Sequence, residues 1–74
     1  MKVQTNYYWR RNANSASIKD EEMSVPVHEV PDFQAIRFMK LLEDMGCKKH
    51  ENASQIFFNK IINSHESEEY IFYK

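Results

Sequence analysis

Aromatic and basic side chains gather in one short string near the start of the sequence, Tyr7-Tyr8-Trp9-Arg10-Arg11. Rings beside arginines stack on unpaired bases and hold phosphates, and Trp, Tyr and Arg are also enriched in protein-binding hot spots. Because neighbouring side chains of a strand point to opposite faces, Tyr8 and Arg10 share one face, and Tyr7, Trp9 and Arg11 share the other. The sequence leaves open whether Trp9 lies in the core or on the surface; if it is core, Tyr8 and Arg10 are the exposed pair.

A second basic cluster, Lys48-Lys49-His50, follows the strongest helical pattern of the chain. Cations near a helix C-terminus favour the negative end of its dipole, which gives this cluster a purely structural reading. The functional reading joins it to the first string as a split basic and aromatic surface for nucleic acid, formed by Tyr8, Arg10, Arg11, Lys48 and Lys49. The formal net charge of −1 excludes a strongly basic nucleic-acid clamp.

Residue types that ligate metals or act as nucleophiles are few and scattered. Cys47 and His50 have a Cys-x-x-His spacing, but structural zinc needs four ligands, and His28 and His65 would have to come from distant segments. No third group is placed to orient a Cys-His pair, and a single glycine leaves no room for a glycine-rich phosphate loop. The sequence therefore predicts no catalytic residue, no metal and no small-molecule cofactor.

Length and composition bound the architecture. The 74 residues allow one domain, 1–74, and one cysteine excludes a disulfide framework. No apolar run approaches the roughly 18 residues that span a membrane, and residues 1–6 lack the apolar region of a secretory signal. We expect a cytoplasmic protein with no membrane partner.

The elements that must position these side chains can be read from periodicity. Residues 2–11 alternate as a strand, and residues 17–30 form a second extended segment, placed at a sheet edge because Pro26 has no N–H for a ladder. A helix is predicted over 33–45, capped by Asp32 and ended by the only glycine, Gly46. Its predicted buried face comprises Ala35, Phe38, Met39, Leu42 and Met45.

The last third of the chain is less sharply patterned. Residues 47–52 fit a short strand or a connection, and 55–62 fit both a strand and a helix, of which we predict the strand. Residues 68–74 form a final strand with Tyr70 and Tyr73 on opposite faces. The sequence thus predicts an α+β two-layer sandwich in β-β-α-β-β order, with one helix on a mainly antiparallel sheet of three to four strands.

The ten aromatic residues exceed what one helix on a small sheet is expected to bury. The surplus predicts a small, non-enzymatic protein-binding regulator, an inhibitor or adaptor of the kind that phages and mobile elements encode. Its partner would be another protein or a second copy. It would bind through the aromatic and arginine surface and a sheet edge, with partner-binding residues Tyr8, Arg10, Arg11, Tyr70 and Tyr73. The alternative is the nucleic-acid-binding module described above.

Overall fold

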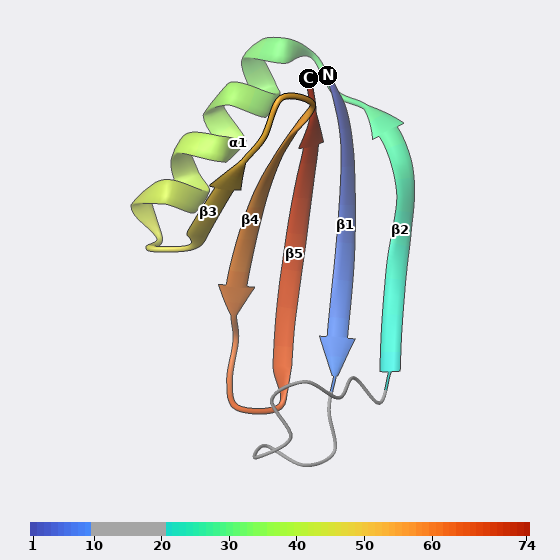
Figure 1. Ribbon diagram of the computed structural model, residues 1–74, viewed down its shortest axis with the longest axis vertical. Coiled ribbons are helices and arrows are strands. Elements are labelled where there is room, and N and C mark those ends of the chain that lie inside the picture. Colours follow the sequence, from blue (N-terminus) through green and yellow to red (C-terminus); the bar gives the residue numbers. More distant parts are fainter. Residues whose placement is uncertain (10–20) are drawn as a thin grey trace.

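Strand β1 (Lys2–Trp9) runs through the middle of the fold, with β2 (Glu21–Glu29) on one side and β5 (Glu66–Tyr73) on the other. The computed structural model describes residues 1–9 and 21–74, with residues 21–24 described by their backbone alone. Its described strands form one antiparallel sheet in the order β2-β1-β5-β4-β3 (Figure 1). The predicted α+β class is confirmed. The predicted strand count and order are wrong, because the described part has five strands in β-β-α-β-β-β order.

The fifth strand comes from a segment too short for periodicity to decide. Strand β3 (Lys48–Glu51) pairs with β4 (Gln55–Ile61), and a turn that begins at Asn52 connects the two strands. The Asn52 side-chain oxygen accepts hydrogen bonds from the backbone N–H of Ser54 (2.9 Å) and of Gln55 (2.8 Å). This side-chain turn fixes the hairpin. Residues 55–62 are confirmed as a strand rather than a helix over Gln55–Ile61.

A second asparagine closes the next hairpin in the same way. The Asn63 side-chain oxygen accepts from the backbone N–H of His65 (2.8 Å) and of Glu66 (2.9 Å), which turns β4 into β5. Strand β5 begins two residues before the predicted start and pairs with β1 along its whole length. Strands from the two ends of this sequence therefore lie side by side at the centre of the sheet (Figure 1).

The edge position predicted for the second strand is confirmed. Between the pairs Val3–His28 and Thr5–Val25 the register shifts, so that Pro26 and Val27 together oppose a single residue of β1. A bulge of this kind accommodates the missing N–H of Pro26 without breaking the ladder on either side. The predicted strand over 2–11 is confirmed as far as Trp9; residues 10 and 11 lie outside the described residues.

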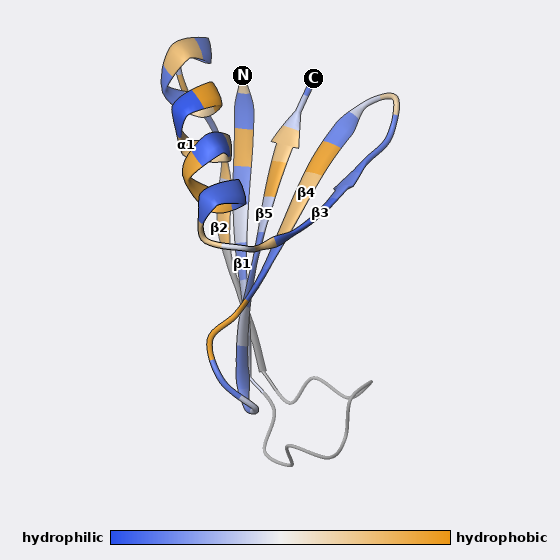
Figure 2. Cartoon of the chain, turned by 90° about the vertical axis from the view of Figure 1, so that its left-hand side faces the viewer, coloured by the Kyte–Doolittle hydropathy of each residue, from blue (hydrophilic) through white to orange (hydrophobic). Residues whose placement is uncertain are grey.

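Helix α1 (Asp32–Asp44) lies on one face of the sheet, beginning near the N- and C-terminal ends of the chain and running down the side of β4 and β3 (Figures 1 and 2). The predicted cap is wrong: Pro31 is the N-cap residue, with no side-chain cap. The Asp32 carboxylate instead accepts a 2.9 Å hydrogen bond from the Met1 ammonium. The predicted stop is confirmed, since Gly46 has φ +80°, a left-handed conformation that favours glycine.

The core lies between α1 and the upper part of the sheet. Its buried members are Val3, Ala35, Leu42, Phe58 and Phe72. Of the predicted helix face, Ala35 and Leu42 are buried and Met39 is partly buried, but Phe38 and Met45 are exposed. Strands β1, β2 and β5 continue past the end of the helix, so the lower half of the sheet has no helix over it (Figure 1).

Candidate functional site

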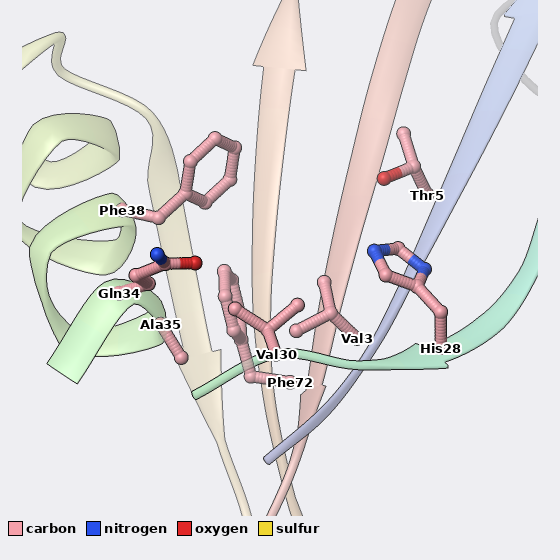
Figure 3. Close-up of a pocket in the computed structure, with 8 residues that line it drawn as sticks. All are labelled: Val3, Thr5, His28, Val30, Gln34, Ala35, Phe38 and Phe72. Atoms are coloured by element: carbon pink, nitrogen blue, oxygen red, sulfur yellow. The ribbon is translucent and has the colours of Figure 1, made fainter. Parts of the chain in front are cut away.

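A cavity of about 300 Å³ opens between α1 and the β1–β2 edge of the sheet. Its floor is formed by core side chains, and polar side chains stand around its mouth (Figure 3). The helix covers this side of the sheet incompletely, because α1 lies toward β4 and β3 while β2 forms the opposite edge (Figure 1). The lining residues are Val3, Thr5, His28, Val30, Gln34, Ala35, Phe38 and Phe72.

The cavity continues onto the outer side of the helix. Gln34 and Phe38, one helical turn apart, also line a shallow hollow that reaches Arg37 and Leu41. Four large apolar side chains are exposed in this part of the fold. Phe38 (37 %) and Leu41 (54 %) line the hollow itself. Val25 (50 %) is paired with Thr5 of the cavity, and Met45 (50 %) follows Leu41 by one helical turn, where it lines a separate hollow with Cys47 and Ile61. We name these four residues the α1–β2 surface.

The α1–β2 surface was missed by sequence reasoning, which placed Phe38 and Met45 in the core and Leu41 at its flank. A signal was present. Apolar residues occupy positions 33, 35, 36, 38, 39, 41, 42 and 45, which is more than one face of a helix this short can bury. The sheet accepts only the stripe around Ala35 and Leu42. Met39 is partly buried beside this stripe, and the other five apolar residues are exposed to water.

The tyrosines predicted to bind a partner do not form one patch. Tyr8 and Tyr73 both lie on the sheet face opposite the helix, but Tyr8 pairs with Ser67 and Tyr73 with Lys2. At roughly 3.3 Å per residue they stand about 20 Å apart along the strands. Tyr70 lies on the helix-facing side, with its ring 5.3 Å from that of Phe38. Arg10 and Arg11 lie outside the described residues.

Trp9 falls between the two readings that the sequence left open. It is half-buried and lies on the helix-facing side of β1, paired with Glu66, but beyond the end of α1. It is not a member of the core cluster.

Three glutamates of β5 each accept a hydrogen bond from a tyrosine hydroxyl. Tyr7 donates to Glu66 (2.7 Å), Tyr8 donates to Glu69 (3.0 Å), and Tyr70 donates to Glu68. The bond from Tyr7, with a second from Asn63, lowers the pKa of Glu66 below its usual value. Burial, with Glu68 beside it, raises the pKa of Tyr70. The acidic run of β5 is therefore tied into the sheet, which its sequence alone did not indicate.

The two lysines of the basic cluster point to opposite faces of β3. Lys49 lies on the helix side and forms a 2.9 Å ion pair with Glu43, which raises the pKa of Lys49. Lys48 lies on the open face in the row Asn6–Glu69–Asn59–Lys48. A carboxylate, Glu69, thus stands between Lys48 and the Tyr8 side of the sheet.

The histidines and the cysteine are dispersed across the fold. Cys47 is half-buried after α1, while His28 stands at the mouth of the cavity. Across residues 1–9 and 21–74, no three His, Cys, Asp or Glu side chains are grouped so as to hold a metal ion. Over the same residues, no helix has the length and apolar character needed to cross a membrane.

The cavity and the hollow on the outer side of α1 adjoin each other, because Gln34 and Phe38 line both. Comparisons with protein-family models, with curated proteins and with solved structures found no match to this chain.

Proposed function

We propose that the chain is a protein-binding regulator that docks a partner protein on the α1–β2 surface. The observation that supports it is that Phe38 and Leu41 are both exposed in one hollow, which adjoins the cavity through Gln34 and Phe38. Scattered apolar residues are ordinary on protein surfaces, whereas a contiguous apolar region bordered by polar groups marks an interaction site.

The composition of this region fits a docked protein. Phe38 and Leu41 supply apolar contact area, and Arg37 borders the same hollow as a charged rim residue. A protein interface is built in this way, with an apolar centre and a polar rim that keeps water away from it. Such docking is driven by the burial of apolar surface, which contributes about 25 cal/mol per Å².

The edge strand β2 contributes side chains rather than backbone to this interaction. An incoming strand needs a continuous row of N–H and C=O groups along the edge. Pro26 removes one N–H, and the bulge at Pro26 and Val27 interrupts the register. The role predicted for a sheet edge is therefore proposed for the exposed side chain of Val25 on β2, and not for the addition of a strand to the β2 backbone.

The nucleic-acid alternative has less support. Nucleic-acid affinity comes largely from phosphate contacts by unpaired cations on one surface. Lys49 is engaged by Glu43, and Lys48 is separated from Tyr8 by the carboxylate of Glu69. A mobility-shift assay at low salt tests this alternative directly: binding that weakens steeply as salt is added would favour it over protein docking.

Paired helix variants test the proposal. Leu41→Gln with Met45→Gln removes two apolar groups from the α1–β2 surface while keeping good helix formers. Ile36→Gln is the matched control, because Ile36 is equally exposed but is not part of the α1–β2 surface. Tagged wild-type protein is used to capture partners from its host, and light scattering after size exclusion measures self-association.

The expected result is a stoichiometric complex, with another protein or with a second copy, that the double variant loses and Ile36→Gln keeps. The proposal fails if the wild-type chain is a strict monomer that captures nothing. It also fails if the complex survives the double variant unchanged.

A further inference from the structure

Three polar side chains from three different elements converge on the mouth of the 300 Å³ cavity. They are Thr5 of β1, His28 of β2 and Gln34 of α1, and Figure 3 shows the Thr5 hydroxyl, one ring nitrogen of His28 and the Gln34 carboxamide turned toward the cavity. Within the described part of the chain, the hydroxyl of Thr5 and the carboxamide of Gln34 have no protein hydrogen-bond partner. A pocket in which unpaired polar groups meet over an apolar floor is the usual form of a ligand site.

The geometry of His28 fixes which of its nitrogens is available. Its Nδ1 lies 3.2 Å from the carbonyl oxygen of Pro26. When Nδ1–H donates to that carbonyl, Nε2 is left as an acceptor, and this is the nitrogen that faces the cavity in Figure 3. The cavity therefore presents an acceptor on its β2 side, while Thr5 and Gln34 can each donate or accept.

The floor and one wall of the cavity are apolar and aromatic. Phe72 and Ala35 are fully buried at its base. The Phe38 ring forms a wall, 5.8 Å from the Phe72 ring and tilted to it by 47°. Aromatic rings prefer such tilted or edge contacts to each other, so a further ring inserted beside Phe38 would extend this cluster.

We propose that this cavity binds a flat aromatic group that carries an O–H or N–H donor, that is, a phenol or an indole. The ring packs against Phe38 above the buried Phe72, and the donor bonds to His28 Nε2, with Thr5 and Gln34 completing the polar edge. The cavity volume lies at the small end of the roughly 300–1,000 Å³ of ligand sites, which suits one or two fused rings.

A phenol or indole ring can come from two sources. A Tyr or Trp side chain of a docked protein supplies it, and so does a free small molecule. In the first case the inference rests on the proposed function and names the partner's anchor residue; in the second it stands without a protein partner.

Titration of the isotope-labelled protein with side-chain analogues tests the site itself. The probes are p-cresol, 3-methylindole and toluene, followed through the backbone amide signals of Val3, Thr5, His28 and Ala35. We expect saturable shifts confined to the cavity, with p-cresol and 3-methylindole binding about three- to tenfold more tightly than toluene because of one hydrogen bond. No saturable shift, or equal affinity for toluene, would overturn the proposal.

Variants at the mouth show whether the named groups make that hydrogen bond. His28→Leu and Thr5→Val keep the volume but remove polar atoms, so they should reduce the preference for p-cresol over toluene to less than twofold. Asp44→Asn, on α1 outside the lining residues, is the control and should leave the preference unchanged. A preference that survives both mouth variants contradicts the assignment.

A third variant separates the two sources. Gln34→Trp places a bulky side chain at the exposed mouth and should block all three probes. If it also abolishes partner capture, the ring belongs to a partner; if capture persists, the ring is that of a free molecule. If the wild type binds p-cresol but captures no protein, the proposed function fails while the cavity assignment stands.

Discussion

At the scale of single residues, the unusual feature is how the sheet's polar side chains are partnered. Tyrosine hydroxyls are tied to the glutamates of β5, so these carboxylates have fixed hydrogen bonds rather than water alone. Asn6 is an exception: it is only 7 % exposed, and its side-chain oxygen has no hydrogen-bond partner. The tyrosine–glutamate hydrogen bonds and the unpartnered Asn6 oxygen should each affect the free energy of unfolding.

The Tyr7–Glu66 hydrogen bond should make stability depend on acid pH. Because the folded state lowers the pKa of Glu66 below 4.5, the bond contributes stability above that pH, and the contribution is lost as pH falls through the folded-state pKa. Tyr7→Phe should raise the pKa of Glu66 and reduce stability at pH 6 but not at pH 3. Urea unfolding across pH and a carboxyl NMR titration measure the two effects. Tyr8→Phe, which concerns Glu69, is the control; an unchanged pKa of Glu66 in Tyr7→Phe would contradict the argument.

The unpartnered oxygen of Asn6 predicts a stabilising substitution. Its amide nitrogen donates to Glu69 at 3.2 Å, but the buried oxygen has lost its hydrogen bonds to water. Such an unpaired group costs about 1–3 kcal/mol, while the hydrogen bond contributes about 1 kcal/mol. Asn6→Leu should therefore raise the free energy of unfolding by up to about 1 kcal/mol, and Glu69 keeps its bond from Tyr8. A clear loss of stability in urea unfolding would show that the amide matters more than its orphaned oxygen.

At the scale of elements, α1 is the part whose packing differs most from its sequence pattern. Its apolar residues cover more than one face, and the sheet buries only a narrow stripe of them. The end of the helix, by contrast, follows directly from its sequence, because Gly46 adopts the positive φ that stops it.

Two neighbouring leucines should behave very differently. Leu42 is 2 % exposed in the core cluster, whereas Leu41 is mostly exposed on the α1–β2 surface. Leu42→Ala should cost about 2–5 kcal/mol, and Leu41→Ala should change the free energy of unfolding by less than about 0.5 kcal/mol. Denaturant unfolding of the two variants measures this. Similar costs for both would place the helix in a different rotation on the sheet.

The helix stop predicts a modest and specific penalty at Gly46. A Cβ at this position would meet nothing within 4 Å, so any cost comes from the backbone conformation at φ +80° and not from a clash. Gly46→Ala should destabilise the fold by about 1–2 kcal/mol, and Gly46→Asn by less, because Asn tolerates the left-handed region better. Equal stability of Gly46→Ala and the wild type would contradict this account.

At the scale of the whole molecule, the central pairing joins strands from the two ends of the sequence. Val3 pairs with Phe72 and Thr5 with Tyr70, and α1 lies on one face of the sheet toward β4 and β3 (Figure 1). The sheet is therefore complete only when strands distant in sequence have paired. The cavity and the α1–β2 surface form in the same step.

This topology predicts slow folding for so small a chain. Pairings between residues far apart in sequence carry a large loop-closure cost before they are stabilised. Stopped-flow measurements of Trp9 fluorescence should show folding in milliseconds to seconds. A microsecond phase with full amplitude would mean that the local hairpins, β3–β4 and β4–β5, form most of the structure before β1 and β5 pair.

The sequence by itself determined those elements whose residues act locally. Alternation predicted the strand over 2–9, Pro26 placed its strand at an edge, and Gly46 ended the helix, because each depends on backbone constraints within a few residues. Over 55–61 the β-branched and aromatic residues favoured a strand, but the pattern also fitted a helix. Residues 48–51 were too few to show a strand or helix period. Asp32 was a plausible N-cap by residue type, but in the structure its carboxylate accepts a hydrogen bond from the Met1 ammonium.

Alternation already placed Tyr70 and Tyr73 on opposite faces of their strand, but only the tertiary structure decided which face the helix covers. On the open face Tyr8 and Tyr73 stand far apart along the strands, and the basic cluster is divided between the two faces of β3. Thr5, His28 and Gln34 come from three different elements and line one cavity, and their spacing in the sequence gives no sign that they lie together. Strand register and helix rotation are set by non-local packing, and the candidate site is a product of both.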